Sequence, residues 1–168
     1  MDIFLKPIKV KDVNSSYCKW LNDKKVIKYT EQRYKKNKLS DIFSFVKKTS
    51  KLKNTYIYGI FLKKNKEHIG NITLGPINFN HKSAEIGFFL GNKKYWKKGI
   101  TSSAIQLIIL IAKKKFKIKK LLAGCYEINK ASKAILLKNK FILEGKLKSQ
   151  IIYNKKRYNY LIFGYLIK

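Results

Sequence analysis

The chain has 168 residues, of which 45% are hydrophobic and 14% aromatic, and it contains 2 prolines and 9 glycines. These values predict one domain over residues 1–168 with an ordinary core, and they exclude a disordered tail, a collagen-like repeat and a mini-protein. The formal net charge of +30 attracts anionic ligands, and it raises the question of nucleic-acid binding.

The first third of the chain predicts one strand followed by helices. Its apolar residues alternate at first and then recur at helical spacing, and residues with short polar side chains precede the helical stretches. The predicted elements are a strand at residues 3–8, a helix with Asp12 as its N-cap, a short helix at 26–29, a polar loop at 30–38, and a helix capped by Ser40 or Asp41.

From residue 56 onward, β-branched and aromatic runs separated by Lys, Asn and Pro predict strands, which then alternate with helices. The order predicts a mixed sheet with helices on its faces, which is an α/β fold class. The predicted elements are strands at 56–62, 68–74 and 84–90, a helix at 99–116, a strand at 120–126, a helix opened by Asn129, and strands at 141–147 and 158–167.

The basic residues are unusual in kind, because Arg33 and Arg157 are the two arginines and the other 37 basic residues are lysines spread along the chain. Proteins that read nucleic-acid grooves favour the planar fork of arginine. Many Lys, Ile and Asn residues with few Arg, Ala and Pro are typical of an AT-rich genome. We therefore interpret the charge as composition first and keep nucleic-acid binding as the alternative.

Several segments bear on location and metal binding. Residues 1–7 contain no apolar leader, and the longest apolar run, at 104–112, is too short to span a bilayer. We expect a cytoplasmic protein without a membrane partner. Cys18 and Cys125 lack metal-ligand spacing, so we expect two reduced thiols and no metal site.

The joint between the strand at 84–90 and the following helix is a candidate anion site. Gly99 opens the helix, whose first amides have no acceptor within the helix, and Lys97 and Lys98 lie beside it. The spacing matches neither a P-loop nor a dinucleotide motif. Taken alone, the segment is more typical of an ordinary helix cap than of an anion site.

Two segments around this joint resemble the GNAT family of N-acetyltransferases, in the branch of ribosomal-protein N-terminal and amino-sugar acetyltransferases. The first runs from residues 84–90 into 95–104, and the second is 129–132 followed by 138–141. The resemblance covers nearly the whole chain. It departs from the family pattern at Lys97 and Lys140, where glycine is usual, at Thr101, and at Leu136, where many relatives carry an acid tyrosine.

The resemblance implies a GNAT fold, with a mixed and mostly antiparallel sheet flanked by helices. It also implies acetyl-CoA as co-substrate, transfer of its acetyl group to a primary amine, no metal, and a possible homodimer. The positions that match the family's cofactor-binding segments are Phe88, Phe89, Leu90, Trp96, Lys97, Lys98, Gly99, Ile100, Thr101, Ser102, Asn129 and Ser132.

Direct acetyl transfer needs a neutral amine, a donor to the developing oxyanion and a proton for the leaving thiolate. Glu85 lies mid-strand, where a carboxylate is costly unless it is paired or faces a cleft, so it is the candidate base. A salt bridge to a lysine is the alternative. With Leu136 at the acid position, the thiolate proton would come from Ser132, Tyr126 or water.

The candidate acceptor-binding residues lie before the second helix and before the 84–90 strand. Arg33 stands out because an arginine in a lysine-rich chain suits bidentate recognition of phosphate or carboxylate. Trp20 is more typical of a core anchor than of an acceptor contact. The full set is Trp20, Glu31, Arg33, Tyr34, Asn80 and His81.

The positive field favours an anionic acceptor over a polycation such as spermidine. The leading hypothesis is N-acetylation of a nucleotide-linked amino sugar, and a protein N-terminus, as of a ribosomal protein, is the alternative acceptor. A non-catalytic acetyl-CoA binder and a nucleic-acid-binding module are the hypotheses from other classes.

Overall fold

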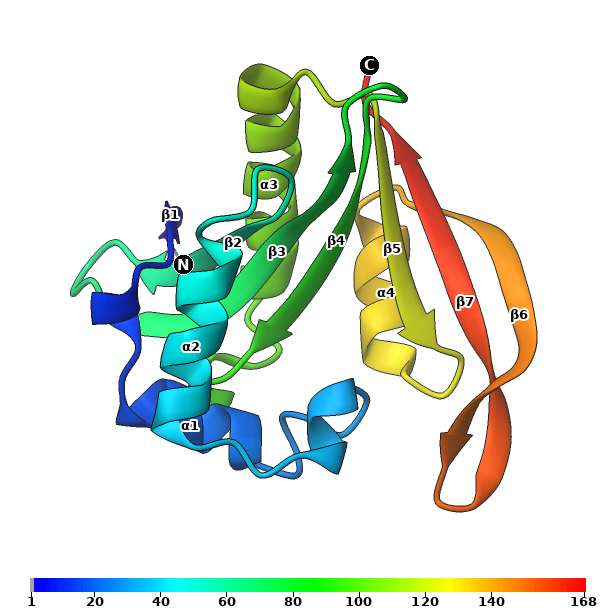
Figure 1. Ribbon diagram of the computed structural model, residues 1–168. Coiled ribbons are helices and arrows are strands. Elements are labelled where there is room, and N and C mark those ends of the chain that lie inside the picture. The colour runs from blue at the N-terminus through cyan, green and yellow to red at the C-terminus, as the bar shows by residue number, and fades with distance from the viewer. Residues whose placement is uncertain (1) are drawn as a thin grey trace.

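The computed structural model describes residues 2–168, and its main elements follow the predicted order (Figure 1). The strands are β1 (Ile3–Pro7), β2 (Tyr56–Leu62), β3 (His68–Asn78), β4 (Ser83–Leu90), β5 (Lys120–Tyr126), β6 (Ile142–Tyr153) and β7 (Lys156–Leu166). The α-helices are α1 (Ser15–Asn22), α2 (Leu39–Thr49), α3 (Ile100–Phe116) and α4 (Lys130–Lys138), with 3-10 helices at Val10–Asp12, Glu31–Tyr34 and Lys93–Tyr95.

The seven strands form one sheet in the order β1-β2-β3-β4-β5-β7-β6. Every neighbouring pair is antiparallel except β4 and β5, which are parallel. Helices α3 and α4 cover one face, and α1 and α2 cover the other (Figure 1). The predicted mixed, mostly antiparallel sheet flanked by helices is confirmed.

The larger core lies between the sheet and α3. Apolar residues recur on α3 at intervals of four, and Ile100, Ala104, Ile108 and Ala112 are each at most 1% exposed. This spacing places them on one stripe of the helix, where they pack against the sheet. Within residues 2–168, α3 and the other helices lack the length and apolarity needed to cross a bilayer.

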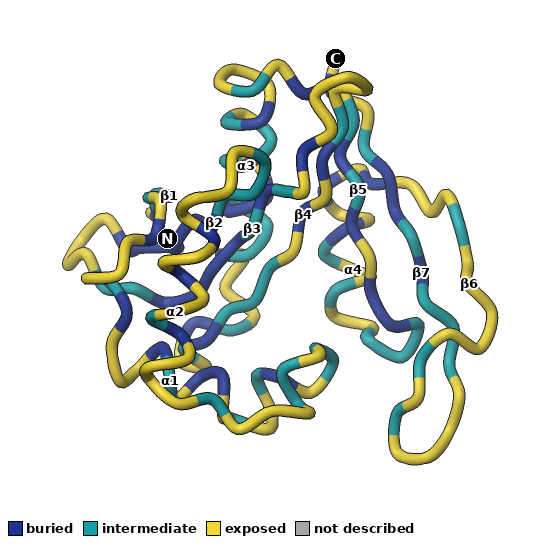
Figure 2. Tube along the Cα trace, in the orientation of Figure 1, coloured by how far each residue is buried: buried dark blue, intermediate teal, exposed yellow. Residues whose placement is uncertain are grey.

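The second core lies on the opposite face and covers less of the sheet. It joins residues of α1 and α2 to β2, among them Tyr17, Ile42, Val46 and Ile57. Among residues 2–168, no helix lies over β5, β7 and β6 on this face (Figures 1 and 2). The two faces are therefore unequally covered, and the candidate site lies where the cover ends.

The starts of α1 and α2 differ from the sequence prediction. Asn14 caps α1 by accepting the Tyr17 N–H at 3.0 Å. Asp12 instead ends the preceding 3-10 helix, where its carboxylate accepts the Lys9 N–H at 2.9 Å. The prediction of Asp12 as the N-cap is wrong because the chain makes this extra turn before the helix begins.

Helix α2 begins before Ser40, at Leu39. The Asp41 carboxylate accepts the Lys38 N–H at 2.9 Å from inside the first turn. Asp41 therefore stabilises the helix start as a first-turn residue rather than as the N-cap, and Ser40 is not the cap either.

The segment between α1 and α2 also differs from the prediction. Residues 26–29 form turns rather than a short helix, and a 3-10 helix at Glu31–Tyr34 interrupts the predicted polar loop. A four-residue helix has no propensity signal of its own. The contacts of Arg33, described below, tie this turn to distant strands.

Strands β4 and β5 are paired over a short length. The pairs join Ser83, Ala84 and Glu85 to residues 120–122, and the pairing ends there. β5 pairs with β7 along its whole length, but after residue 122 it no longer pairs with β4. Within residues 2–168, the edge of 86–90 that faces β5 therefore has no strand beside it. The two strands diverge toward the lower part of Figure 1.

Two lysines occupy left-handed backbone conformations at the positions where the resemblance expects glycine. Lys97 has φ 60° and Lys140 has φ 64°. Lys140 follows Asn139, the C-cap of α4, and the next N–H, that of Phe141, bonds back to the Leu136 carbonyl at 3.1 Å. This helix end favours glycine, because a Cβ in the left-handed region costs about 1 kcal/mol.

We expect Lys140→Gly to raise the free energy of unfolding by about 1 kcal/mol, because it removes the left-handed strain. The melting temperature should rise by about 2–4 °C in thermal denaturation. Lys133→Gly is the matched control, since it removes the same charge from inside α4 and should cost about 1 kcal/mol. Equal shifts in both variants would show that charge, not backbone conformation, controls stability here.

Candidate active site

A cavity of about 750 Å³ lies at the end of β4 and the start of α3. All twelve residues named above for acetyl-CoA line it, together with residues from the loop after α1 and from α4. The cavity thus joins the unpaired strand edge, the helix start and α4. The twelve residues expected from the sequence are Phe88, Phe89, Leu90, Trp96, Lys97, Lys98, Gly99, Ile100, Thr101, Ser102, Asn129 and Ser132.

The start of α3 gives this cavity an anion-binding end. Gly99 precedes the helix with φ 75°, and a Cβ there would meet nothing within 4 Å, so backbone conformation rather than space favours glycine. The first amides of the helix have no acceptor within it, and Lys97 and Lys98, which line the cavity, add positive charge. The Ser102 hydroxyl oxygen accepts the Asn139 amide N–H at 2.8 Å, which ties the first turn of α3 to the end of α4.

A second cavity of about 490 Å³ lies between β4, β5 and the β6–β7 hairpin. Five residues line both cavities: Tyr29, Thr30, Phe88, Asn129 and Ser132. The two spaces therefore meet at this junction, and a group held in one can reach a group held in the other. After the expectations from the sequence, we refer to the first as the cofactor cavity and to the second as the acceptor cavity.

Asn129 and Ser132 form a bonded pair at the junction. The Asn129 amide donates to the Ser132 hydroxyl oxygen at 2.9 Å, and its carbonyl oxygen accepts the Ser132 N–H at 3.2 Å. The Ser132 oxygen is an acceptor in this pair, so its own proton is free to point into the cavities. Leu136, one turn later, is 0% exposed and packs in the core.

Arg33 brings together four of the sequence candidates. Its guanidinium donates to the hydroxyls of Tyr126 and Tyr34, each at 2.6 Å, and to the Ile152 carbonyl at 3.1 Å. The Tyr126 hydroxyl in turn donates to the Glu31 carboxylate. One arginine thus connects the 3-10 helix, the end of β5 and the β6–β7 hairpin.

The Tyr126 phenol is neutral at physiological pH. Burial, and then the hydrogen bond to Glu31, raise the pKa of Tyr126 to about 12. Its proton points to Glu31, so the phenol holds Glu31 in place at the edge of the acceptor cavity, which both residues line.

The structure places Trp20 in the core instead of the acceptor cavity. It is 9% exposed, and its ring packs on Gly91 so closely that a Cβ there would lie 2.1 Å from the ring. It lines neither cavity. The interpretation of Trp20 as a core anchor is confirmed, and its assignment as an acceptor contact is wrong, because the large apolar ring of this α1 residue is more stable buried against Gly91, directly after β4.

Asn80, His81 and Glu85 lie apart from the Arg33 group. Asn80 and Glu85 line a separate cavity of about 540 Å³ near the β3–β4 turn. His81 is exposed in that turn, where its N–H bonds to the Asn78 side chain. The turn lies at the opposite end of β4 from the cofactor cavity, so Asn80 and His81 are not brought to the junction.

Glu85 is exposed, and within residues 2–168 it forms no ion pair with a lysine. The salt-bridge interpretation is therefore wrong. Burial, and then the Glu85 charge, raise the pKa of Tyr160, a residue that lines the acceptor cavity. Glu85 thus lies beside the acceptor cavity without lining it.

Several residues of the acceptor cavity were not found from the sequence. Tyr29 and Thr30 come from turns, and Gln150 and Ile151 come from a bulged part of β6 where the register with β7 shifts. A shift of this kind changes which side chains face inward, and no sequence motif marks it. The tyrosines that recur in this part of the sequence, including Tyr160, were a feature from which the cavity could have been predicted.

We expect Arg33→Lys to lower the free energy of unfolding by about 1–2 kcal/mol, since an ammonium cannot bridge all three acceptors. Hydrogen exchange should become faster at 151–158, on the hairpin. Arg157→Lys is the matched control, because Arg157 makes one exposed bond, to the Ser149 carbonyl at 3.0 Å. Equal effects of the two variants would contradict a bridging role for Arg33.

Comparison with known proteins shows that the chain is similar to acetyltransferases. The family profile described as "Acetyltransferase (GNAT) domain" matches residues 2–142. The ribosomal-protein-serine acetyltransferase of Escherichia coli is 35% identical over 85 residues, which are 51% of this chain and 47% of that protein. The chain thus matches about half the length of this curated relative.

Solved structures are similar over almost the whole chain. A microcin self-immunity acetyltransferase, solved with acetyl-CoA and AMP, is 27% identical with a TM-score of 0.84, covering 99% of this chain and 93% of that one. The spermidine N-acetyltransferase of Vibrio cholerae, solved with CoA and spermine, is 16% identical with a TM-score of 0.86, covering 98% and 95%. The second likeness concerns the fold alone.

Proposed function

Because the chain belongs to the GNAT family of acetyltransferases, we propose that residues 1–168 form one cytoplasmic N-acetyltransferase domain that moves acetyl from acetyl-CoA to a primary amine on an anionic acceptor. The observation that carries this proposal is the junction of the two cavities at Phe88, Asn129 and Ser132. A thioester in one cavity and an amine in the other can meet there without a covalent enzyme intermediate.

In this proposal the cofactor lies along the edge of β4 that faces β5. The amides of its pantetheine arm pair with backbone groups of 88–90, which have no strand beside them. Its pyrophosphate binds at the start of α3, near Lys97 and Lys98. The Asn129 side chain, already fixed by Ser132, orients the arm near the thioester.

The transfer needs a proton to leave the amine and a stabilised sulfur to leave the carbonyl. The neutral amine attacks the thioester carbon, the C–S bond breaks, and the electron pair goes to sulfur. Thiolates are weak bases, with a thiol pKa of about 8.5, so a hydrogen bond from Ser132 is enough to stabilise the leaving group until a proton arrives from the amine or solvent.

Glu31 is the carboxylate best placed to take the amine proton, directly or through water, since it lines the acceptor cavity and Tyr126 holds it there. Glu85, the base suggested by the sequence, lines the neighbouring cavity and is the second candidate.

For the acceptor we propose a nucleotide-linked amino sugar. The charge of +30 concentrates anions near the site and repels polyamines. The microcin self-immunity acetyltransferase, which is 27% identical, was solved with AMP, and this supports an acceptor that carries a nucleotide.

A protein N-terminus is the second candidate acceptor. It is favoured by the 35% identity to the ribosomal-protein-serine acetyltransferase. It would place a peptide rather than a nucleotide across the acceptor cavity.

The first test is release of free thiol from acetyl-CoA with a panel of amines: UDP- and dTDP-linked amino sugars, N-terminal peptides and spermidine. We expect turnover on a nucleotide-linked sugar, with kcat/KM falling about 10-fold as salt rises from about 25 to 300 mM, because screening weakens attraction. Turnover on peptides alone would move the function to the second candidate. Turnover on spermidine alone would contradict an anionic acceptor.

We expect Ser132→Ala to lower kcat by about 100-fold with the Kd for acetyl-CoA unchanged, because the lost hydrogen bond acts on the leaving sulfur.

Glu31→Gln should lower kcat/KM at pH 7.5 by about 100-fold, since an amide still accepts from Tyr126 but takes no proton. Glu85→Gln is the matched control and should cost less than about 10-fold. The reverse order would assign the base to Glu85.

A further inference from the structure

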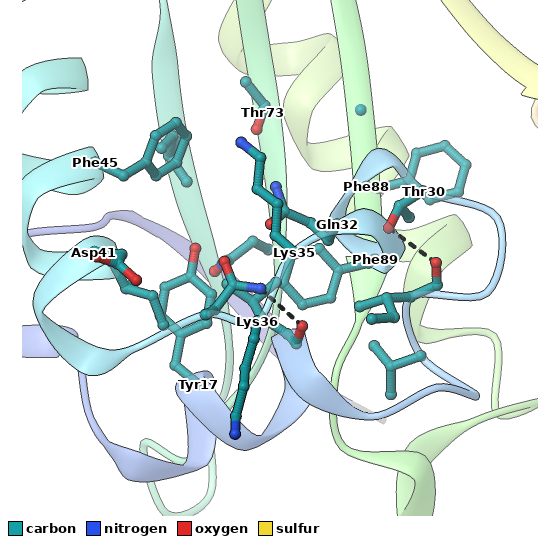
Figure 3. A pocket seen from close by; sticks show the side chains of 18 residues that line it. Tyr17, Thr30, Gln32, Lys35, Lys36, Asp41, Phe45, Thr73, Phe88 and Phe89 are labelled. Carbon is teal, nitrogen blue, oxygen red and sulfur yellow. Dashed lines mark hydrogen bonds between the residues drawn. The ribbon is translucent and has the colours of Figure 1, made fainter.

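A third cavity, of about 600 Å³, lies between α2, the 30–37 segment and the face of β2–β4 (Figure 3). It shares Thr30, Gly87 and Phe88 with the acceptor cavity, and two of these, Thr30 and Phe88, also line the cofactor cavity. The three cavities therefore meet, yet this one has no role in the chemistry derived above. We refer to it as the α2 cavity.

Gly87 lies where the α2 cavity passes into the acceptor cavity. It lines both of these cavities but not the cofactor cavity. Successive side chains of a strand point to opposite faces of the sheet. Ile86 and Phe88 pack with the core on the α3 side, and Phe89 packs with the core of α1 and α2. Gly87 therefore faces the α1 and α2 side, where it is exposed.

Neither backbone conformation nor lack of space explains a glycine at this position. Within residues 2–168, Gly87 is the one glycine of nine that has neither a left-handed φ nor any atom within 4 Å of where its Cβ would lie. By contrast, a Cβ at Gly124, on β5, would clash with the Tyr160 side chain. A glycine inside a strand costs stability, because it restricts a flexible backbone and packs no side chain. What Gly87 provides is open space above the strand.

Positive charge lies at the α2 end of this space. Lys35 and Lys36 line the α2 cavity, and Figure 3 shows Lys35 reaching toward Thr73, the residue of β3 that pairs with Gly87. Within residues 2–168 neither lysine forms an ion pair. Asp41 also lines the cavity, and its carboxylate is bonded to a backbone N–H at the start of α2. Two ammonium groups against one carboxylate leave this end positive.

Negative charge lies at the other end of the space. Glu31 lines the acceptor cavity and not the α2 cavity, whereas Lys35 and Lys36 line the α2 cavity and not the acceptor cavity. Gly87, which lines both, lies between them. A molecule with an amine at one end and an anionic group at the other therefore complements the charges at the two ends. An uncharged acyl chain complements neither.

We propose that Gly87 is a specificity-determining residue, and that the acceptor lies across it with its amine in the acceptor cavity and its anionic end in the α2 cavity. This inference rests on the proposed transfer of acetyl to an amine on an anionic acceptor. The amine then lies near Glu31, and Lys35 and Lys36 attract the anionic end. A side chain at residue 87 would occupy the same space as the acceptor and exclude it.

The test is a pair of substitutions of rising size, Gly87→Ala and Gly87→Val, assayed with a UDP-linked amino sugar at saturating acetyl-CoA. We expect the KM for the amino sugar to rise about 3-fold in the first and about 30-fold in the second, because the added atoms fill the space. The Kd for acetyl-CoA should stay unchanged, since Gly87 does not line the cofactor cavity. The melting temperature should equal or exceed that of the wild type, since a Cβ meets no atom there.

Gly145→Ala is the matched control. Gly145 lies in β6, has no left-handed φ and lines none of the three cavities, and a Cβ there would be in ordinary contact with Ile162 at 3.6 Å. This variant should leave the KM unchanged. An unchanged KM in Gly87→Val, or equal rises in Gly87→Ala and Gly145→Ala, would overturn the proposal. A weaker Kd for acetyl-CoA with an unchanged KM for the amino sugar would assign the space to the co-substrate and would also overturn it.

A further variant leaves the strand unchanged, in case Gly87→Val does not fold. Lys35→Ala should raise the KM for the amino sugar about 5-fold with the Kd for acetyl-CoA unchanged, because it removes attraction for the anionic end. An unchanged KM in this variant would show that the anionic end lies elsewhere and would overturn the proposal.

Failure of this inference is distinguishable from failure of the proposed function. Acetylation of the amino sugar with a KM that Gly87→Val leaves unchanged would overturn the inference and leave the function standing. If the wild type does not acetylate the amino sugar, calorimetric titration of that sugar into the CoA-bound protein decides. Binding that Gly87→Val weakens about 30-fold would support the inference while the proposed acceptor fails, and equal or absent binding would overturn both.

Discussion

The short pairing of β4 with β5 is the constraint on which the rest of the site depends. Two parallel strands that stay paired for three residues and then diverge leave their facing edges, at 86–90 and 123–126, without a strand partner among residues 2–168. Backbone groups at such an edge need hydrogen-bond partners, which an extended ligand with amides can supply. The divergence also opens the space in which the cofactor and acceptor cavities meet.

The surroundings of this opening come from both faces of the sheet. On one face α3 and α4 contribute the start of a helix and the Asn129–Ser132 pair. On the other face the incomplete cover by α1 and α2 leaves the acceptor side accessible, and Arg33 fastens the intervening segment to the β6–β7 hairpin. The site is thus an arrangement of helix ends and turns around one unpaired edge, with the cores keeping those parts in place.

Charge acts in this protein at two scales. Most lysines are exposed and spread along the chain, so they create a general positive field. A few have local consequences, as Lys97 and Lys98 do at the start of α3. Lysine also stands at left-handed positions such as 97 and 140, where it has a conformational cost that glycine would avoid. The same compositional preference thus affects both electrostatics and backbone strain.

The sequence by itself determined the strands, the longer helices and the residues expected on the cofactor side of the site. Those features depend on local periodicity and on contiguous motifs, and Phe88, Gly99 and Ser132 could be named from them. Only the tertiary structure decided the acceptor side. Trp20 lies in the core because burial is a property of three-dimensional packing, and Arg33 bonds to Tyr126 and to the Ile152 carbonyl because the fold brings three distant segments together. Contacts between residues far apart in the chain have no local signal, so sequence patterns do not contain them.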